Sequence, residues 1–172
     1  MEARKLVRTS LIIIILAVNV SCDQISKSIV RERIEYHDQI SLLRGHLTLM
    51  KVENTGAFLS AGNNLPQPIK LIFLGIIPLA AMAIALVYVF TKERLSVVRV
   101  AGICFLIGGG IGNIADRMIY GSVTDFLHLR LGVLQTGIFN LADVSIMTGI
   151  FLILFSAYIT ELFSSRRKDA VG

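Results

Sequence analysis

The sequence predicts an all-α membrane protein with four transmembrane helices and a small periplasmic or extracellular β element. Hydrophobic residues make up 54% of the 172 residues and charged residues only 17%. Mean hydropathy is +0.71, whereas soluble domains are only about 45–50% apolar. The apolar residues also lie in long runs, and one helix needs about 20 of them to cross a bilayer core of about 30 Å.

The apolar runs form one polytopic membrane domain over residues 1–172. We expect spans at residues 6–30, 69–90, 97–115 and 139–163. Each run is long enough for a helix to cross the hydrocarbon core. The second half of the first run also carries Asp23 and Lys27.

Basic residues at the ends of the spans predict the orientation. They precede the first span, separate the second from the third and follow the fourth: Arg4, Lys5, Arg8; Lys92, Arg94, Arg99; Arg166, Arg167, Lys168. Cytoplasmic loops are rich in Lys and Arg, so we expect both termini to be cytoplasmic. Because these cations lie at membrane edges, the net charge of +5 does not indicate nucleic-acid binding.

The two outward connections contain strand-like sequence. The first covers residues 31–68, and its residues 46–49 alternate between polar and apolar after a possible hairpin turn at Arg44-Gly45. The second connection includes an alternating stretch at residues 126–131. We therefore expect a small β element on the outer membrane surface.

The N-terminus resembles a cleavable lipoprotein signal, with basic residues, an apolar stretch and then Ser21-Cys22. However, Asn19 stands three positions before the cysteine, where such a signal has Leu or a similar residue. Further spans also follow. We therefore interpret this segment as the first span, with Cys22 and Cys104 as small buried hydrophobic residues.

Polar residues gather at the outward ends of the spans, where polarity is costly. They are Asp23, Lys27, Asn113, Asp116, Arg117, Asp125, Asn140 and Asp143. Asp23 and Lys27 could be a simple i,i+4 pair, and Asn140 with Asp143 could cap a helix. Taken together, these structural roles account poorly for four aspartates with only Lys27 and Arg117 nearby.

Paired carboxylates have a specific chemical use. Two close carboxylates cannot both ionise cheaply, so they share a proton, as in aspartic proteases. The ionised group then activates water while the protonated group assists the carbonyl oxygen and the leaving amine. This chemistry needs no cofactor, and the scattered His37, His46 and His128 do not suggest a metal site.

Five motifs together resemble bacterial lipoprotein signal peptidase, signal peptidase II, over residues 23–143. They are Asp23-Gln-Ile-Ser-Lys27, Asn54-Thr-Gly-Ala-Phe58, Gly109-Gly-Ile-Gly-Asn-Ile-Ala-Asp-Arg117, Val123-Thr-Asp-Phe126 and Phe139-Asn-Leu-Ala-Asp143. One departure is Gly56-Ala57-Phe58-Leu59, where the family often has Gly-Ala-Ala-Phe.

The resemblance implies an aspartyl endopeptidase of the bacterial cytoplasmic membrane, with Asp125 and Asp143 as the dyad near the outer leaflet. It implies that diacylglyceryl-modified prolipoproteins are the substrates, cut just before the lipidated cysteine, and that globomycin-type inhibitors block the dyad. Membrane lipids are the other expected partners. Supporting or substrate-binding roles fall on Asp23, Lys27, Asn54, Gly56, Asn113, Asp116, Arg117, Asn140 and Ala142.

Two other classes of protein fit parts of the pattern. A small transporter or channel also carries charges inside the membrane, but these should be spread through its depth. A non-catalytic scaffold would tolerate Asp125→Asn and Asp143→Asn, because an amide and a carboxylate are nearly isosteric.

The outward β element near Asn54 could also act as a movable cover over the site.

Overall fold

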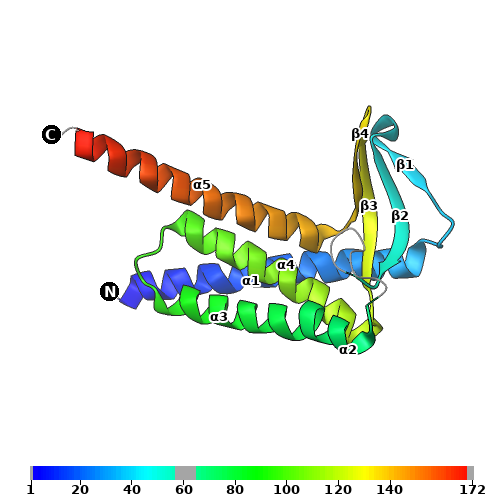
Figure 1. Cartoon of the computed structure of the whole chain (residues 1–172), viewed down its shortest axis with the longest axis horizontal. Coiled ribbons are helices and arrows are strands. Elements are labelled where there is room, and N and C mark those ends of the chain that lie inside the picture. Colours follow the sequence, from blue (N-terminus) through cyan, green and yellow to red (C-terminus); the bar gives the residue numbers. More distant parts are fainter. Residues whose placement is uncertain (1, 57–64, 170–172) are drawn as a thin grey trace.

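The fold is a bundle of four long helices with a small antiparallel sheet across one end (Figure 1). The computed structural model describes residues 2–56 and 65–169, with side chains described as far as Phe163. The helices are α1 (Glu2–Arg33), α3 (Ile77–Thr91), α4 (Val97–Tyr120) and α5 (Leu141–Asp169). Helix α1 begins, and α5 ends, at the end of the bundle away from the sheet (Figure 1).

Four helical stretches are long and apolar enough to cross a membrane: Glu2–Arg33, Gln67–Thr91, Val97–Tyr120 and Leu141–Phe163. Together with the sheet, they confirm the predicted fold class of apolar helices with a small β element. Helix ends need not coincide with membrane surfaces, so the span limits given above stay predictions.

Helix α4 is the central helix. Of its most apolar stretch 56% is buried, against 11% for each of the other three helices. Its glycines allow the close approach, since an added Cβ would meet a different helix at each position. Gly108 lies against Asn19 of α1, Gly109 against Ala142 of α5, and Gly110 against Met82 of α3. Small residues at helix interfaces are typical of membrane bundles.

The second apolar stretch is irregular where it faces α4. A short helix α2 (Gln67–Lys70) passes into a π-helical segment (Leu71–Ile76), and α3 then has Pro78 in its first turn. Proline has no backbone N–H and interrupts the regular helical hydrogen bonds. Such π segments are frequent at functional sites, and this one lies beside the pocket described below.

The two cysteines lie in different surroundings. Cys104 is fully buried in α4 and packs with Ile12, Val89 and Val100. Cys22 is exposed on α1, so the expectation that it is buried is wrong. The reason is that only one side of α1 packs against the bundle, which leaves apolar residues on its other side facing outward.

The sheet joins the two connections at one end of the bundle. Its strands are β1 (Ile40–Leu42), β2 (Leu47–Asn54), β3 (Val123–Leu131) and β4 (Leu134–Phe139), in that order and antiparallel. The pairing of β2 with β3 places Val52 opposite Asp125. A cluster of Val30, Ile34 and Phe126 packs the sheet against the end of α1. The sheet therefore fixes the position of Asp125 relative to the helices.

The first hairpin turns where the sequence predicts it. Leu43, Arg44 and Gly45 between β1 and β2 all have positive φ. Strand β4 was not anticipated, although the two residues Gly132-Val133 between β3 and β4 carry a signal. Gly132 has φ +62°, and a glycine at the first position of a two-residue loop is typical of a type II′ hairpin.

We expect Gly109→Ala to lower the thermal stability more than Gly110→Ala does. A Cβ at Gly109 would collide with the backbone carbonyl of Ala142, whereas one at Gly110 would meet the sulfur of Met82, a flexible side chain. Overpacking typically costs about 1–3 kcal/mol. Thermal unfolding of both variants in detergent checks this, and equal losses of Tm would show that the backbone of Ala142 is no tighter a constraint than the side chain of Met82.

Candidate active site

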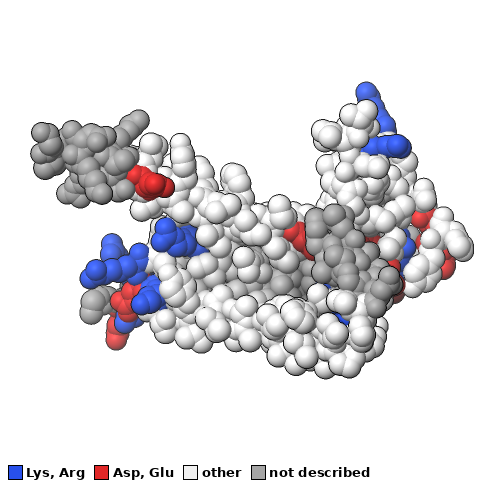
Figure 2. All heavy atoms as spheres, in the orientation of Figure 1, with Lys and Arg blue, Asp and Glu red and all other residues white. Residues whose placement is uncertain are grey.

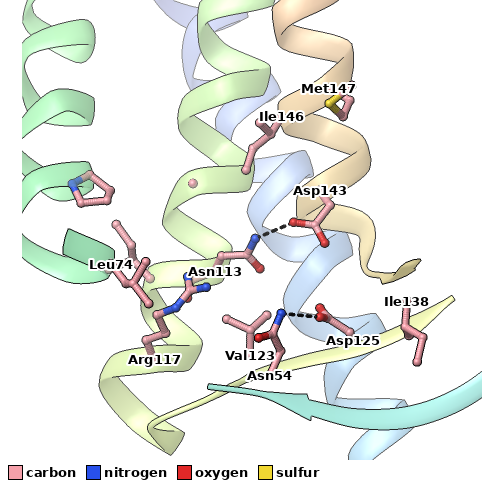
Figure 3. Close-up of a pocket in the computed structure, with 13 residues that line it drawn as sticks. Asn54, Leu74, Asn113, Arg117, Val123, Asp125, Ile138, Asp143, Ile146 and Met147 are labelled. Atoms are coloured by element: carbon pink, nitrogen blue, oxygen red, sulfur yellow. Dashed lines mark hydrogen bonds between the residues drawn. The ribbon is translucent and has the colours of Figure 1, made fainter. Parts of the chain in front are cut away.

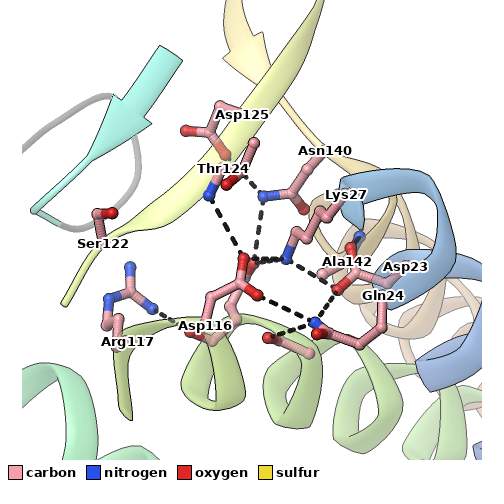
Figure 4. A network of polar contacts seen from close by, with 12 residues as sticks. Asp23, Gln24, Lys27, Asp116, Arg117, Ser122, Thr124, Asp125, Asn140 and Ala142 are labelled. Carbon is pink, nitrogen blue, oxygen red and sulfur yellow. Dashed lines mark hydrogen bonds and ion pairs between the residues drawn. The ribbon is translucent and has the colours of Figure 1, made fainter. Parts of the chain in front are cut away.

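A buried ionic cluster joins α1 to α4. The ammonium of Lys27 lies 2.8 Å from an oxygen of Asp23 and 3.1 Å from an oxygen of Asp116. All three side chains are essentially inaccessible, with 0–1% of each exposed. Figure 4 shows Lys27 between the two acids. The i,i+4 pair predicted on α1 is therefore part of a larger buried network, and Asp116 supplies its second anion.

Two residues of this network were not predicted from the sequence. The side-chain amide of Gln24 donates to Asp23, to Asp116 and to the backbone carbonyl of Gly112, each at 3.1 Å. Arg31 binds Asp116 at 2.8 Å and lies over the ring of Tyr120. Gln24 falls inside the Asp23–Lys27 motif, and Arg31 follows Lys27 by one helical turn. These positions along α1 were the signal in the sequence from which both contacts could have been predicted.

Ala142 contributes through its backbone. Its N–H donates to Asp23 at 2.9 Å, and its methyl group lies near Gly112. A larger side chain at this fully buried position would meet α4. This explains why a small residue stands there, and it links α5 to the ionic cluster.

The amide of Asn113 connects the ionic cluster to Asp143. Its oxygen accepts hydrogen bonds from Lys27 at 2.9 Å and from Asn140 at 3.1 Å. Lys27 can only donate, so this contact fixes the orientation of the amide. The NH2 group of Asn113 is then directed at Asp143, to which it donates at 2.9 Å (Figure 3).

Asn140 caps helix α5 and reaches Asp125. Its side-chain oxygen accepts from the backbone N–H of Asp143 at 3.0 Å, while its own N–H donates to the Asp143 carboxylate at 3.1 Å. This reciprocal pair is a capping box, as the sequence suggested. Since the oxygen is used in the cap, the NH2 group is left to donate to Asp125, at 2.6 Å. Capping and site geometry thus depend on the same side chain.

Asn54, Gly56 and Arg117 form the third support. The N–H of Gly56 donates to the side-chain oxygen of Asn54 at 3.0 Å, and the NH2 group of Asn54 donates to Asp125 at 3.0 Å. The guanidinium of Arg117 donates to the Gly56 carbonyl at 2.8 Å. Ala57 and Phe58 of the same motif lie outside the described residues. The β element near Asn54 is described as β1 and β2, and its movement as a cover stays a prediction.

Asp125 and Asp143 thus have all their carboxylate oxygens in contact with amide donors. Asp125 accepts from Asn54 and Asn140, and Asp143 accepts from Asn113 and from the backbone of Asn140. Asp125 is 4% exposed. Burial raises the pKa of its carboxyl to about 6. The charge of Asp143 raises this pKa as well, while the hydrogen bonds from Asn54 and Asn140 lower it.

Both aspartates line a pocket of about 360 Å³. Its polar side carries Asn54, Asn113 and Arg117. Its apolar walls include Leu74 of the π-helical segment and Met147 of α5 (Figure 3). Figure 2 shows acidic atoms in the hollow between α5 and the sheet. Within the described ranges, no three His, Cys, Asp or Glu side chains are grouped so that they could hold a metal ion.

The structure brings the candidate residues together in two groups. One is the pocket, with Asp125 and Asp143 supported by Asn54, Asn113 and Asn140. The other is the ionic cluster behind it, made by Asp23, Lys27 and Asp116. Asp116 lies with this second group and accepts from the backbone N–H of Thr124. It therefore supports β3, the strand that carries Asp125.

Comparisons with known proteins identify the family of the chain. Residues 13–159 match the family model described as signal peptidase (SPase) II. A lipoprotein signal peptidase of Maridesulfovibrio salexigens is 33% identical over 148 residues, which is 84% of this chain and 93% of the relative. One from Brucella ovis is 34% identical and covers 91% of this chain and 93% of its own.

Solved structures show the same fold. A bacterial membrane enzyme determined by the in meso method at 2.3 Å resolution superposes with a TM-score of 0.75 and 30% identity, over 86% of this chain and 87% of its own. A second such enzyme, at 1.9 Å resolution, gives a TM-score of 0.72 and 28% identity.

We expect Lys27→Met to destabilise the bundle strongly. Breaking a buried ion pair by removing one partner typically costs about 3–5 kcal/mol, and here two buried carboxylates would lose their shared cation. Unfolding in detergent measures the loss. Lys5→Met is the control, since the Lys5–Glu93 pair is exposed, and we expect little change there. Adding Asp23→Asn should restore part of the stability of Lys27→Met. Wild-type stability of Lys27→Met would contradict this account.

Proposed function

The chain belongs to the signal peptidase II family and is a lipoprotein signal peptidase, and we propose that it works as an aspartyl endopeptidase. In this proposal it cleaves diacylglyceryl-modified prolipoproteins just before the lipidated cysteine. The observation that carries the proposal is the pair Asp125 and Asp143, which line one pocket and share Asn140 as a hydrogen-bond donor.

The pair can hold one proton between two carboxyl groups. The raised pKa of Asp125 favours its carboxyl as the proton holder. Because the two groups interact, the pair titrates with apparent values that belong to both. Each carboxylate has an amide donor on both oxygens, so their positions are fixed before substrate arrives. Such preorganisation lowers the reorganisation needed during the reaction.

The reaction follows from this proton arrangement. The ionised carboxylate accepts a proton from a water molecule as the water oxygen bonds to the peptide carbonyl carbon. The protonated carboxyl donates a hydrogen bond to the carbonyl oxygen, which stabilises the developing negative charge. A proton then passes from the dyad to the leaving nitrogen, and the C–N bond breaks. The products are the signal peptide, ending in a carboxylate, and a lipoprotein with a free cysteine amine.

The pocket suits a substrate that stays in the membrane. Leu74 and Pro78 lie on one side, and Ile146 and Met147 lie on the other. A signal peptide helix with apolar side chains could therefore reach the dyad while remaining in the membrane. A second pocket of about 350 Å³ adjoins Asp143 and is lined by apolar groups, including Phe139 and Val144. It could accommodate an apolar part of the same substrate.

Arg117 is suited to contact the substrate backbone. It lines the pocket, and one of its nitrogens, Nη2, holds the Gly56 carbonyl. Its buried Nε has no hydrogen-bond partner among the described residues. A peptide carbonyl at the site could accept from this N–H, which would orient the scissile bond.

The proposal places the dyad near the outer leaflet. The Lys and Arg side chains visible at the end of the bundle away from the sheet (Figure 2) favour a cytoplasmic location for that end. The sheet and both aspartates would then face outward, with both termini inside. The transporter and scaffold alternatives lose support, because the chain belongs to a peptidase family.

We expect Asp125→Asn and Asp143→Asn each to abolish cleavage, because either change leaves a single ionisable carboxyl in the pair. The loss should exceed about a thousandfold, since the nucleophilic water loses its base or the leaving group its acid. A gel-shift assay with a diacylglyceryl-modified prolipoprotein in micelles measures it. Asp38→Asn, at an exposed position on the approach to β1, is the control and should keep activity.

Globomycin is the second arm of that assay, and we expect it to block the wild-type reaction. Full activity in either dyad variant would overturn the catalytic assignment. If the folded wild type leaves the substrate uncut, the peptidase proposal itself fails.

We expect kcat/KM to fall on both sides of an optimum. On the alkaline side it should decline as pH rises through about 6, where the Asp125 proton is lost. On the acid side it should decline once the second carboxyl is also protonated and no base remains. The profile of kcat/KM reports the free enzyme, and it would be measured with stability checked at each pH. A flat profile between about pH 4 and 9 would rule out a shared-proton pair.

A further inference from the structure

A larger pocket lies at the opposite end of the bundle from the dyad. It has a volume of about 750 Å³ and is lined by the first turns of α1, the start of α4 and the loop before it. Four basic side chains and one acid line it: Arg4, Lys5, Arg8, Arg94 and Glu93. Figure 2 shows the cluster of Lys and Arg side chains at this end. The peptidase reaction proposed above gives this pocket no role.

The acid in the pocket already has a partner. The Lys5 ammonium lies 2.8 Å from the Glu93 carboxylate and lowers the pKa of Glu93 through a hydrogen bond and its charge. Among the described residues, no acid lies within ion-pair distance of Arg4, Arg8 or Arg94. The pocket therefore keeps a surplus of positive charge, and it suits an anion.

Arg8 is held in place with a donor left over. Its Nη2 donates to the carbonyls of Val89 and Lys92, at 2.7 and 2.5 Å, at the end of α3. Its Nε is buried and has no hydrogen-bond partner among the described residues. A buried donor without a partner is costly, and a guanidinium matches the geometry of phosphate oxygens.

The other pocket walls are apolar. Val7 and Leu11 of α1 and Val97 of α4 line the pocket beside the cations, and Val7 and Val97 are strongly exposed. A cationic rim next to apolar helix surface, at the end of membrane-spanning helices, has the chemistry of a phospholipid. Basic pockets between transmembrane helices bind anionic lipid headgroups in this way.

We propose that this pocket binds an anionic phospholipid, with its phosphate at Arg4, Arg8 and Arg94 and an acyl chain along Val7, Leu11 and Val97. The lipid would belong to the leaflet opposite the dyad. It would connect α1 to the loop between α3 and α4 and stabilise that end of the bundle. Cations that serve only to orient the protein in the membrane would need no pocket. They would also need no guanidinium that is held in place with an N–H left unpaired. The proposal does not depend on the peptidase mechanism.

The test uses the full chain purified in a neutral detergent. Native mass spectrometry would titrate it with dioleoylphosphatidylglycerol and with dioleoylphosphatidylcholine, which has the same acyl chains and no net charge. The variant Arg4→Gln/Arg94→Gln removes two exposed cations. The matched control Arg44→Gln/Arg130→Gln removes two exposed cations from the sheet. Tm without lipid checks that each variant is folded.

We expect the wild type to prefer the anionic lipid and Arg4→Gln/Arg94→Gln to bind it about thirtyfold more weakly, from the usual effect of two basic residues near a lipid surface. The control should bind as the wild type does. Arg8→Lys keeps the charge but loses the planar fork, so it should also bind more weakly.

Three results would overturn the proposal. Equal affinity for the two lipids would mean that the pocket binds acyl chains and does not discriminate between headgroups by charge. A loss of binding in Arg44→Gln/Arg130→Gln alone would place the lipid at the sheet. A rise in Tm with inorganic phosphate alone as large as the rise with the anionic lipid would identify a site for free phosphate.

Discussion

The buried contact of Lys27 with Asp23 and Asp116 is the constraint on which the rest of the site depends. A charged group in an apolar interior is tolerated only with partners, so α1 and α4 must stay in one register. Gln24 and the backbone N–H of Ala142 add donors from α1 and α5 to the same cluster. The glycines of α4 permit this approach, because a Cβ at Gly112 would occupy the space of Asp23.

The orientation of Asp125 and Asp143 follows from this cluster by hydrogen-bond direction. Each of three asparagines has its amide oxygen bound by a group that can only donate: Lys27 for Asn113, the Asp143 N–H for Asn140 and the Gly56 N–H for Asn54. Their NH2 groups therefore donate, and each of them reaches Asp125 or Asp143. The NH2 group of Asn140 also donates to the Asn113 oxygen. An aspartate in place of any of these asparagines would offer no such donor when ionised.

Sequence reasoning reached the fold class because length and composition decide whether a helix can cross a bilayer. It also selected polar residues around Asp125 and Asp143, because charges near a membrane need an explanation, whereas Asn54, Gly56 and Ala142 were selected through the resemblance to a family. It missed β4, Gln24 and Arg31. Strand β4 is short and weakly patterned, with its Gly132 turn as the main signal. The contacts of Gln24 and Arg31 depend on how α1 rotates against α4, which no single segment specifies.

The most direct test of the central claim is to observe the shared proton. Isotope-edited infrared spectroscopy of the full chain, with labelled aspartate, would follow the protonated carboxyl band as pH is raised. This account predicts a band that disappears as pH passes about 6 and that is altered by both Asp125→Asn and Asp143→Asn. If no carboxyl titrates in that range, or if the band is unchanged in either variant, Asp125 and Asp143 do not share a proton.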